Sequence, residues 1–332
     1  LEVPDPLAGK RVFLEFDGVM SHSTVYVNGR EIGSRPYGYA SFCFEVTRAV
    51  QAGPDNLLAV RCNVKPDASR WYPGAGIFRN VRLVITESLR IAHWGTCITT
   101  PHVDEHSATV RVETTLDGET AGNTDLRLVT EAVDPAGTTV AQTETPVDAS
   151  GNGPLEQELT VADPRRWSPE SPTLYRVVSS LQRDGELVDR QEEPLGFRTL
   201  RFDADKGFFL NGSPMKFQGV CMHHDLGALG AAVNTRALER QFEILREMGC
   251  NALRTSHNPP APEVLDLCDS MGFLVIDEAF DEWRVAKVAN GYHTLFDEWA
   301  ETDLRDLIRR DRNHPCVVMW SIGNEIRDQS VP

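Results

Sequence analysis

The residues that could carry out chemistry gather in the last third of the sequence, each directly after a short apolar run. Glu325 closes the clearest case, the segment "RRDRNHPCVVMWSIGNE", in which five apolar residues lead into a small polar group. Three earlier apolar runs end in the same way, in "MHHD", "RTSHN" and "DEAFDEW". The polar residues delivered there are His223, His224, Asp225, Arg254, Ser256, His257, Asn258, Asp277, Glu278, Asp281 and Glu282. Carboxylates, imidazoles and amides in this number suit acid–base chemistry on a polar ligand.

The elements that must position these residues are strands that alternate with helices. Leu238, Phe242 and Leu245 recur at helical spacing before Gly249, whereas "CVVMW" has no polar face and predicts a strand covered on both sides. We expect strands at 215–221, 251–257, 273–279 and 316–320, and helices at 235–249, 262–272 and 296–313. Such alternation predicts a parallel sheet with right-handed crossovers, whose strand ends meet at one catalytic edge. The segment is shorter than the roughly 250 residues of a closed eight-stranded barrel, so an open sheet or half a barrel is expected.

Two β regions precede this part. Residues 11–86 show period-two alternation, as in "NLLAVRCNV", and Asn28-Gly29 between two short apolar runs predicts a two-residue hairpin. This pattern indicates an antiparallel sandwich. Residues 88–200 contain further short strands at the spacing of an immunoglobulin-like sandwich. We therefore predict three domains, with bounds 1–87, 88–200 and 201–332.

Composition narrows the classes of partner. The formal net charge of -16 would repel a nucleic-acid backbone and an anionic membrane surface, so we expect neither as a partner. The basic run at 309–312 is interpreted as a helix end, where cations complement the helix dipole. Seven scattered cysteines without CxxC spacing indicate buried thiols. No segment has the pattern of a membrane span or a signal peptide, and we expect a cytoplasmic protein whose true N-terminus is missing.

The residue types discriminate between reaction classes. An "HExxH" motif is absent, and adjacent histidines on a strand point to opposite faces, which disfavours a zinc site. GxSxG, GxGxxG and Walker motifs are also absent, which disfavours acyl transfer and nucleotide chemistry. Carboxylates near Trp283 and Trp320 suggest glycoside hydrolysis, which needs a protonated acid and a second carboxylate. A structural interpretation stays open for each residue alone; an ion pair between Arg254 and Glu278 is one example.

Several motifs resemble glycoside hydrolase family 2, its β-galactosidase branch in particular. These motifs are "DKGFFLNGSPMKFQGVCMHHD", "NALRTSHNPP", "FLVIDEAFDEW" and "RRDRNHPCVVMWSIGNE", with "WYPGAGIFRNVRL" and "WSPESPTLYRV" in the β regions. The resemblance implies a jelly-roll-like sugar-binding sandwich, an immunoglobulin-like sandwich and the first half of a TIM (β/α)8 barrel, truncated after its fourth strand.

The resemblance also implies roles for individual residues. Glu325 matches the family's general acid/base, Asn324 the asparagine that binds the sugar 2-hydroxyl, and His257 a histidine of the sugar pocket. Asp225, Arg254 and Glu278 are expected at the same rim as substrate-binding residues. Some members bind magnesium through a carboxylate and a histidine two residues later; Glu282 matches the carboxylate, but Arg284 replaces the histidine. We therefore assign no metal and no cofactor.

The function that the resemblance implies, and that we expect, is a retaining, exo-acting hydrolase of terminal β-galactosides in carbohydrate catabolism. "MHHDLGALGAAVN" and "SHNPPAPEVLDLCD" are more similar to the galactosidase branch than to the glucuronidases. The family's nucleophile is a glutamate at the end of the seventh barrel strand, so we expect these 332 residues alone to be inactive. The alternatives are a β-glucuronidase or other β-glycosidase of the family, a non-catalytic carbohydrate-binding protein, and a purely structural chain. The expected partner is a β-linked galactoside or related oligosaccharide, and a homo-oligomer is compatible with the sequence.

Overall fold

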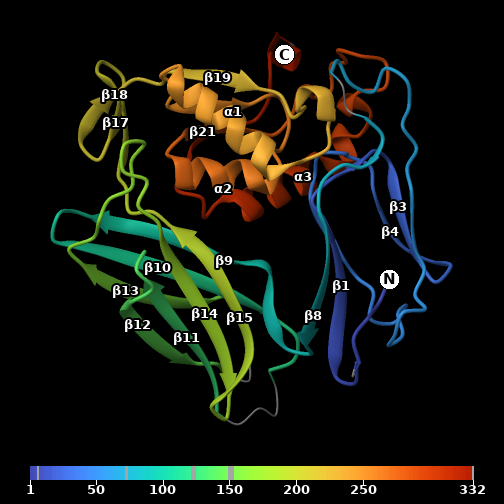
Figure 1. Cartoon of the computed structure of the whole chain (residues 1–332), viewed down its shortest axis with the longest axis horizontal. Helices are drawn as coiled ribbons and strands as arrows, with labels where there is room; N and C mark the ends of the chain where they lie inside the picture. Colours follow the sequence, from blue (N-terminus) through green and yellow to red (C-terminus); the bar gives the residue numbers. More distant parts are fainter. Residues whose placement is uncertain (6, 72–73, 121–124, 149–152, 331–332) are drawn as a thin grey trace.

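The computed structural model describes residues 1–5, 7–71, 74–120, 125–148 and 153–330. Tyr72 and Pro73 of the motif "WYPGAGIFRNVRL" lie outside the described residues. Figure 1 shows the second β region below the α/β region and the first β region at the right of both, with the C-terminal end of the chain at the α/β region. No helix in the described ranges is both long and apolar enough to cross a membrane.

The first β region consists of three small antiparallel sheets around one core. Asn28 and Gly29 have φ angles of 50° and 79°, so the predicted hairpin turn is confirmed. Val12, Phe16, Val25 and related apolar side chains fill the core between the sheets. The sheets are β5-β1-β8, β4-β3-β6 and β2-β7; their strands are β1 (Lys10–Phe16), β2 (Val19–Met20), β3 (Ser23–Val27), β4 (Arg30–Arg35), β5 (Phe42–Glu45), β6 (Leu58–Arg61), β7 (Gly76–Ile77) and β8 (Val81–Glu87).

The second β region has two antiparallel sheets, β13-β10-β9 and β12-β11-β14-β15. The sequence analysis did not predict β9, whose register with β10 shifts twice, or β12, which is half exposed and has few apolar residues. Both features weaken the alternating pattern on which a strand prediction depends. The strands are β9 (Arg90–Val103), β10 (Ser107–Asp117), β11 (Leu126–Val133), β12 (Thr139–Pro146), β13 (Leu155–Ala162), β14 (Tyr175–Arg183) and β15 (Glu186–Leu195).

The α/β region confirms the predicted parallel sheet, in the order β19-β20-β21-β22. Its first strand is shorter than expected, because Met215 belongs to a preceding antiparallel hairpin that turns at Asn211-Gly212. That hairpin belongs to a three-stranded antiparallel sheet of β16 (Leu200–Asp203), β17 (Gly207–Leu210) and β18 (Ser213–Met215). The parallel strands are β19 (Gly219–Met222), β20 (Ala252–Thr255), β21 (Leu274–Glu278) and β22 (Val317–Ser321). The helices are α1 (Thr235–Glu247), α2 (Pro262–Met271) and α3 (Phe296–Asp311), with short 3-10 turns η1 (Gly227–Leu229), η2 (Tyr292–Thr294) and η3 (Arg327–Ser330).

The sequence analysis predicted that β22 is covered on both sides, and this prediction is correct for only half of the strand. Val317 and Val318 are buried, but Met319 and Trp320 are 38% and 39% exposed. The second half of this strand is therefore not covered by the described part of the chain, although its side chains are apolar.

Both β regions are held to the α/β region by arginine side chains that donate hydrogen bonds to backbone carbonyls. Arg79 is fully buried and donates to the carbonyls of Asp17, Tyr39, Pro259 and Pro260, while burial lowers its pKa to about 10. The basic run that ends α3 takes part in this packing, since Arg312 donates to the Trp94 and Thr96 carbonyls at the second β region. These contacts fix how the β regions approach the sheet edge.

Candidate active site

Glu278 organises the carboxyl edge of the parallel sheet. Its Oε2 accepts hydrogen bonds from Arg254 Nε and Nη2 at 3.0 and 2.7 Å and from Ser321 Oγ at 2.6 Å. Its Oε1 lies 2.6 Å from His257 Nδ1. Burial alone would raise the pKa of this carboxyl, but the hydrogen bonds from His257, Ser321 and Arg254 outweigh burial and lower it. The Glu278 side chain has no exposed surface, so it presents Arg254 and His257 to the edge and is not itself accessible.

Asn324 is held in one orientation at the same edge. Arg254 Nη2 donates to its Oδ1 at 3.0 Å, and its Nδ2 donates to Asp281 Oδ1 at 2.9 Å. The Asn324 backbone N–H also donates to the Phe280 carbonyl. An amide group has two N–H donors, so one of them makes no hydrogen bond to the described residues.

Glu325 follows Asn324 directly but is far more accessible. Its backbone has a φ of 46°, and its side chain is 75% exposed. The buried ammonium of Lys287 lies 4.0 Å from Glu325 Oε2 and donates to the Asn324 carbonyl at 2.6 Å. The positively charged Lys287 side chain therefore lies next to the peptide that joins Asn324 to Glu325.

Asp225 lies apart from this hydrogen-bonded group. Among the described residues its carboxylate makes no hydrogen bond to the other predicted site residues, although its charge acts on nearby His223. Burial and the neighbouring His257 lower the pKa of His223, and Asp225 opposes this change. The two adjacent histidines lie just beyond the end of β19 and not on the strand as predicted, but they do have different neighbours: His223 contacts Trp71 and His257, whereas His224 contacts Tyr39 and Phe78.

Glu282 is bound by protein donors. Its Oε2 accepts from the Lys287 N–H at 2.5 Å, and its Oε1 accepts from the His293 N–H at 3.0 Å and lies 2.9 Å from His293 Nδ1. Arg284 points to Asp297, with a distance of 2.6 Å between Nε and Oδ1. Both oxygens of Glu282 are therefore already engaged by groups of the chain itself.

The sequence analysis missed a contribution from the first β region. Arg70 Nε and Nη2 donate to Asp281 Oδ2 and Oδ1 at 3.1 and 2.7 Å. Trp71 packs against His223 and His257, with ring centroids 4.9 and 5.0 Å apart. Two sequence signals were present: the "SRW" triplet, a cation beside an aromatic residue, and the motif "WYPGAGIFRNVRL", which begins at Trp71 and was assigned only to a β region.

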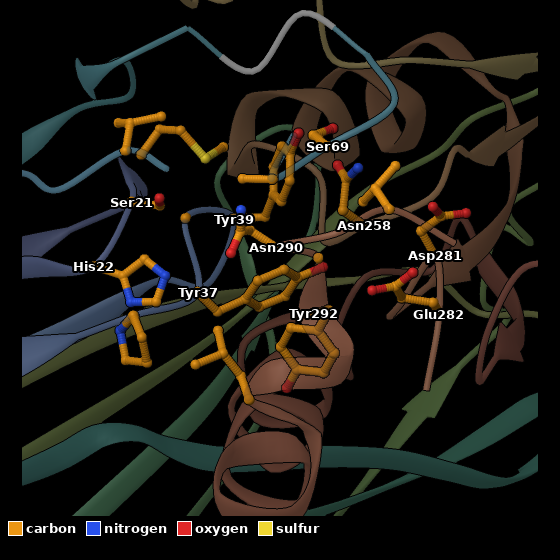
Figure 2. Close-up of a pocket in the computed structure, with 18 of the residues that line it drawn as sticks. Ser21, His22, Tyr37, Tyr39, Ser69, Asn258, Asp281, Glu282, Asn290 and Tyr292 are labelled. Carbon is orange, nitrogen blue, oxygen red and sulfur yellow. The ribbon is translucent and has the colours of Figure 1, made fainter. Parts of the chain in front are cut away.

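A pocket lies where the first β region meets the sheet edge. Figure 2 shows Asp281 and Glu282 at one side of it, Tyr37 and Tyr292 in the middle, and His22 at the other side. The pocket shares His257 and Asp281 with the edge, but Asn324 and Glu325 do not line it. Aromatic rings beside carboxylates and amides suit a polyhydroxylated ligand, and here they come from both regions.

A second cluster of titratable groups lies at the opposite end of β22. His314 Nδ1 lies 2.6 Å from Asp269 Oδ2, and the Cys316 N–H donates to Asp269 Oδ1 at 2.8 Å. Although burial alone would lower the pKa of His314, the Asp269 carboxylate raises it to about 9. Asp269, His314 and Cys316 could each offer one atom to a metal ion, but these atoms already bond to one another and to the backbone. This cluster is therefore a buried ion pair.

Comparisons with known proteins agree with this architecture. Residues 203–330 match the model "Glycosyl hydrolases family 2, TIM barrel domain", and residues 91–198 match "Glycosyl hydrolases family 2". The chain is 50% identical to β-galactosidase BoGH2A of Bacteroides ovatus over 97% of its own length and 38% of the relative, and 34% identical to a β-glucuronidase of Bacteroides fragilis over 96% and 48%.

A solved structure of a family 2 glycosyl hydrolase from Bacteroides cellulosilyticus superposes with a TM-score of 0.96 at 40% identity, over 99% of this chain and 43% of that one. The chain thus spans between about a third and a half of the length of these proteins. Two adjacent family models and a relative with half of its aligned residues identical lead to one conclusion: the chain belongs to glycoside hydrolase family 2.

Proposed function

We propose that this chain carries the acid/base side of a retaining β-glycosidase that removes terminal β-galactosides. The observation that carries the proposal is the contrast between two neighbours: Asn324 is fixed from both ends of its amide, and Glu325 beside it is 75% exposed. A fixed donor beside an accessible acid, at the carboxyl ends of parallel strands, suits catalysis on a bound sugar.

In the proposed reaction, Glu325 protonates the glycosidic oxygen as the leaving group departs and later removes a proton from the attacking water. The free N–H of Asn324 donates to the 2-hydroxyl next to the reacting carbon. His257 and Arg254, both partly exposed and both held by Glu278, bind further hydroxyl groups. Asp225 makes no hydrogen bond to these residues among those described. Its proposed contribution to sugar binding comes from the adjacent part of the sheet edge, near His223.

The nucleophile of this reaction is proposed to come from a part of the barrel beyond residue 332. Glu278 and Glu282 are poor candidates, because their side chains are 0% and 2% exposed and their oxygens are occupied by protein donors. We therefore propose that the 332 residues alone do not turn over glycosides. Hydrolysis by the purified 332-residue chain that is abolished by Glu325→Gln would contradict this placement.

Glu325 can be tested by its dependence on the leaving group. In the full-length polypeptide, Glu325→Gln should slow hydrolysis of glycosides with poor leaving groups by a factor of roughly 10² or more, and of nitrophenyl glycosides much less, because activated leaving groups need little protonation. Glu301→Gln is a matched control, since Glu301 is exposed on α3 and pairs only with Arg305 among the described residues. Equal losses on both substrate types would remove the acid role from Glu325.

Galactoside preference is the finer part of the proposal. The relative at 50% identity is named a β-galactosidase, whereas relatives at 34% identity are named β-glucuronidases. The net charge of -16 also disfavours an anionic sugar. Parallel kinetics on nitrophenyl β-galactoside and β-glucuronide should favour the galactoside, and a higher kcat/KM on the glucuronide would assign the chain to the other branch.

A further inference from the structure

We propose that Arg70, which comes from the first β region, is a positioning residue of this active site: through Asp281 it fixes the side-chain amide of Asn324 against the sugar. The inference rests on the proposed function, because it assigns Arg70 a task in that reaction. It also makes the first β region a structural part of the catalytic centre.

Asp281 is the junction of the arrangement. Its Oδ1 accepts from Arg70 Nη2 at 2.7 Å, from Asn324 Nδ2 at 2.9 Å and from Lys287 Nζ at 3.1 Å. Its Oδ2 accepts from Arg70 Nε at 3.1 Å, and no other described group donates to it. Arg70 therefore holds both oxygens and sets the plane of the carboxylate, as expected of a guanidinium in a bidentate pair.

The plane of the Asp281 carboxylate decides where the Asn324 amide points. Arg254 holds Oδ1 of Asn324 at 3.0 Å, and Asp281 holds Nδ2 at 2.9 Å. These two bonds leave one N–H of Asn324 free in a fixed direction. If Arg70 is lost, Lys287 remains as the single cation on Asp281, on the Oδ1 side only. The carboxylate can then rotate, and the free N–H of Asn324 loses its fixed direction.

The loop that carries Arg70 is itself fixed on the α/β region. Asn290 donates from its side chain to the Pro66 carbonyl at 2.8 Å and from its backbone to the Asp67 carbonyl at 2.9 Å. Trp71 packs against both His223 and His257, and the Arg70 guanidinium lies 4.8 Å from the centre of the Trp71 ring. An exposed ion pair without such support is worth little, so this support is what gives the Arg70 contact its effect.

The test compares two substrates in the full-length polypeptide. Arg70→Met should lower kcat/KM for the nitrophenyl β-glycoside of the preferred sugar by about 10- to 100-fold, mainly through kcat, because a small misplacement of a positioning group is costly. The same variant should lose less than about 3-fold on the 2-deoxy glycoside, because that substrate lacks the hydroxyl that Asn324 binds. A purely structural defect would lower both rates by the same factor.

Three further variants sharpen the comparison. Asp281→Asn keeps the shape of the side chain and should reproduce the selective loss of activity. This variant tests the inference even if Arg70→Met does not fold. Arg70→Ala should recover activity on the normal substrate when millimolar guanidinium ion is added, since the guanidinium of Arg70 is 35% exposed and its site is open to solvent. Arg284→Met is the matched control: Arg284 forms a nearby exposed pair with Asp297, and its loss should change either rate less than 2-fold.

The outcomes separate the inference from the proposed function. If the wild-type protein hydrolyses the glycoside and Glu325→Gln acts as expected, but Arg70→Met and Asp281→Asn lose equally on both substrates or lose nothing, the inference is wrong and the function stands. If the wild-type full-length polypeptide turns over no β-glycoside, both are overturned.

Discussion

Removing the charge of His314 should change how the stability of this protein depends on pH. His314 and Asp269 form a buried pair, with side chains 11% and 2% exposed, and the pKa of His314 is raised to about 9 from an ordinary value of 6.5. At about 1.4 kcal/mol per pKa unit, the pair contributes about 3 kcal/mol to folding. The contribution is fully present below pH 6.5, where both the folded and the unfolded histidine are protonated, and is lost as pH rises through 9.

The assay is urea unfolding of the full-length polypeptide followed by tryptophan fluorescence, for wild type and His314→Gln, between pH 6 and pH 9.5. Groups that titrate in both proteins cancel in the difference between them, and burial raises the pKa of the neighbouring Cys316 well above its usual value. The difference in unfolding free energy between the two proteins should therefore shrink by about 3 kcal/mol across the window. His102→Gln is the control, because that side chain is 57% exposed, and its difference from wild type should stay constant.

A difference between wild type and His314→Gln that stays constant from pH 6 to pH 9.5 would refute the ion pair. A second refuting result would come from a chelator: if EDTA removes the difference, the cluster of Asp269, His314 and Cys316 holds a metal ion and the charge argument fails.

Two further predictions concern the packing of the β regions on the α/β region. Gly272→Ala should lower the free energy of unfolding in urea by roughly 2 kcal/mol or more, because φ is 76° and a Cβ would lie 2.4 Å from the Pro169 carbonyl oxygen. Gly249→Ala is the control: with φ of 87° and nothing within 4 Å of the added Cβ, it should cost only about 1 kcal/mol in the same assay. Arg79→Met should lower stability by about 3 to 5 kcal/mol, because it removes the donor of the Tyr39, Pro259 and Pro260 carbonyls and leaves the Asp17 carbonyl with the Ser41 hydroxyl alone, and a loss below about 1 kcal/mol in chemical unfolding would contradict this accounting.

Local sequence patterns were sufficient to predict the elements that pack against the next element along the chain. Asn28-Gly29 and Asn211-Gly212 specify hairpins because the required positive φ is a property of the residues themselves. The parallel sheet followed from the alternation of apolar runs and amphipathic segments. β9 was missed because two shifts in its register with β10 break the alternation, and such shifts depend on the partner strand.

The same distinction between local and long-range contacts applies to the residues of the candidate site. Arg254, His257, Glu278 and Asn324 could be placed together in advance, because the ends of neighbouring parallel strands must meet. Arg70 could not, because 211 positions separate it from Asp281 and no periodic pattern records that contact. Lys287 was missed for a related reason: it lies in a long loop after β21, where its burial depends entirely on tertiary packing.

The segment from His257 to Pro260 has two neighbours with different tasks, and this limits how the protein can be recombined. His257 faces the candidate site and is bound to Glu278, while the carbonyls of Pro259 and Pro260, two and three residues later, receive the Arg79 guanidinium from the first β region. A foreign sandwich grafted in place of residues 1–87 would have to reproduce the donor geometry of Arg79 as well as an Arg70 side chain. A graft without the Arg79 donor would shift the segment that carries His257. A graft without Arg70 would leave the Asp281 carboxylate free to rotate. An exchange of this sandwich between relatives should therefore be tolerated only when both arginines, or an equivalent pair of donors, are transferred together.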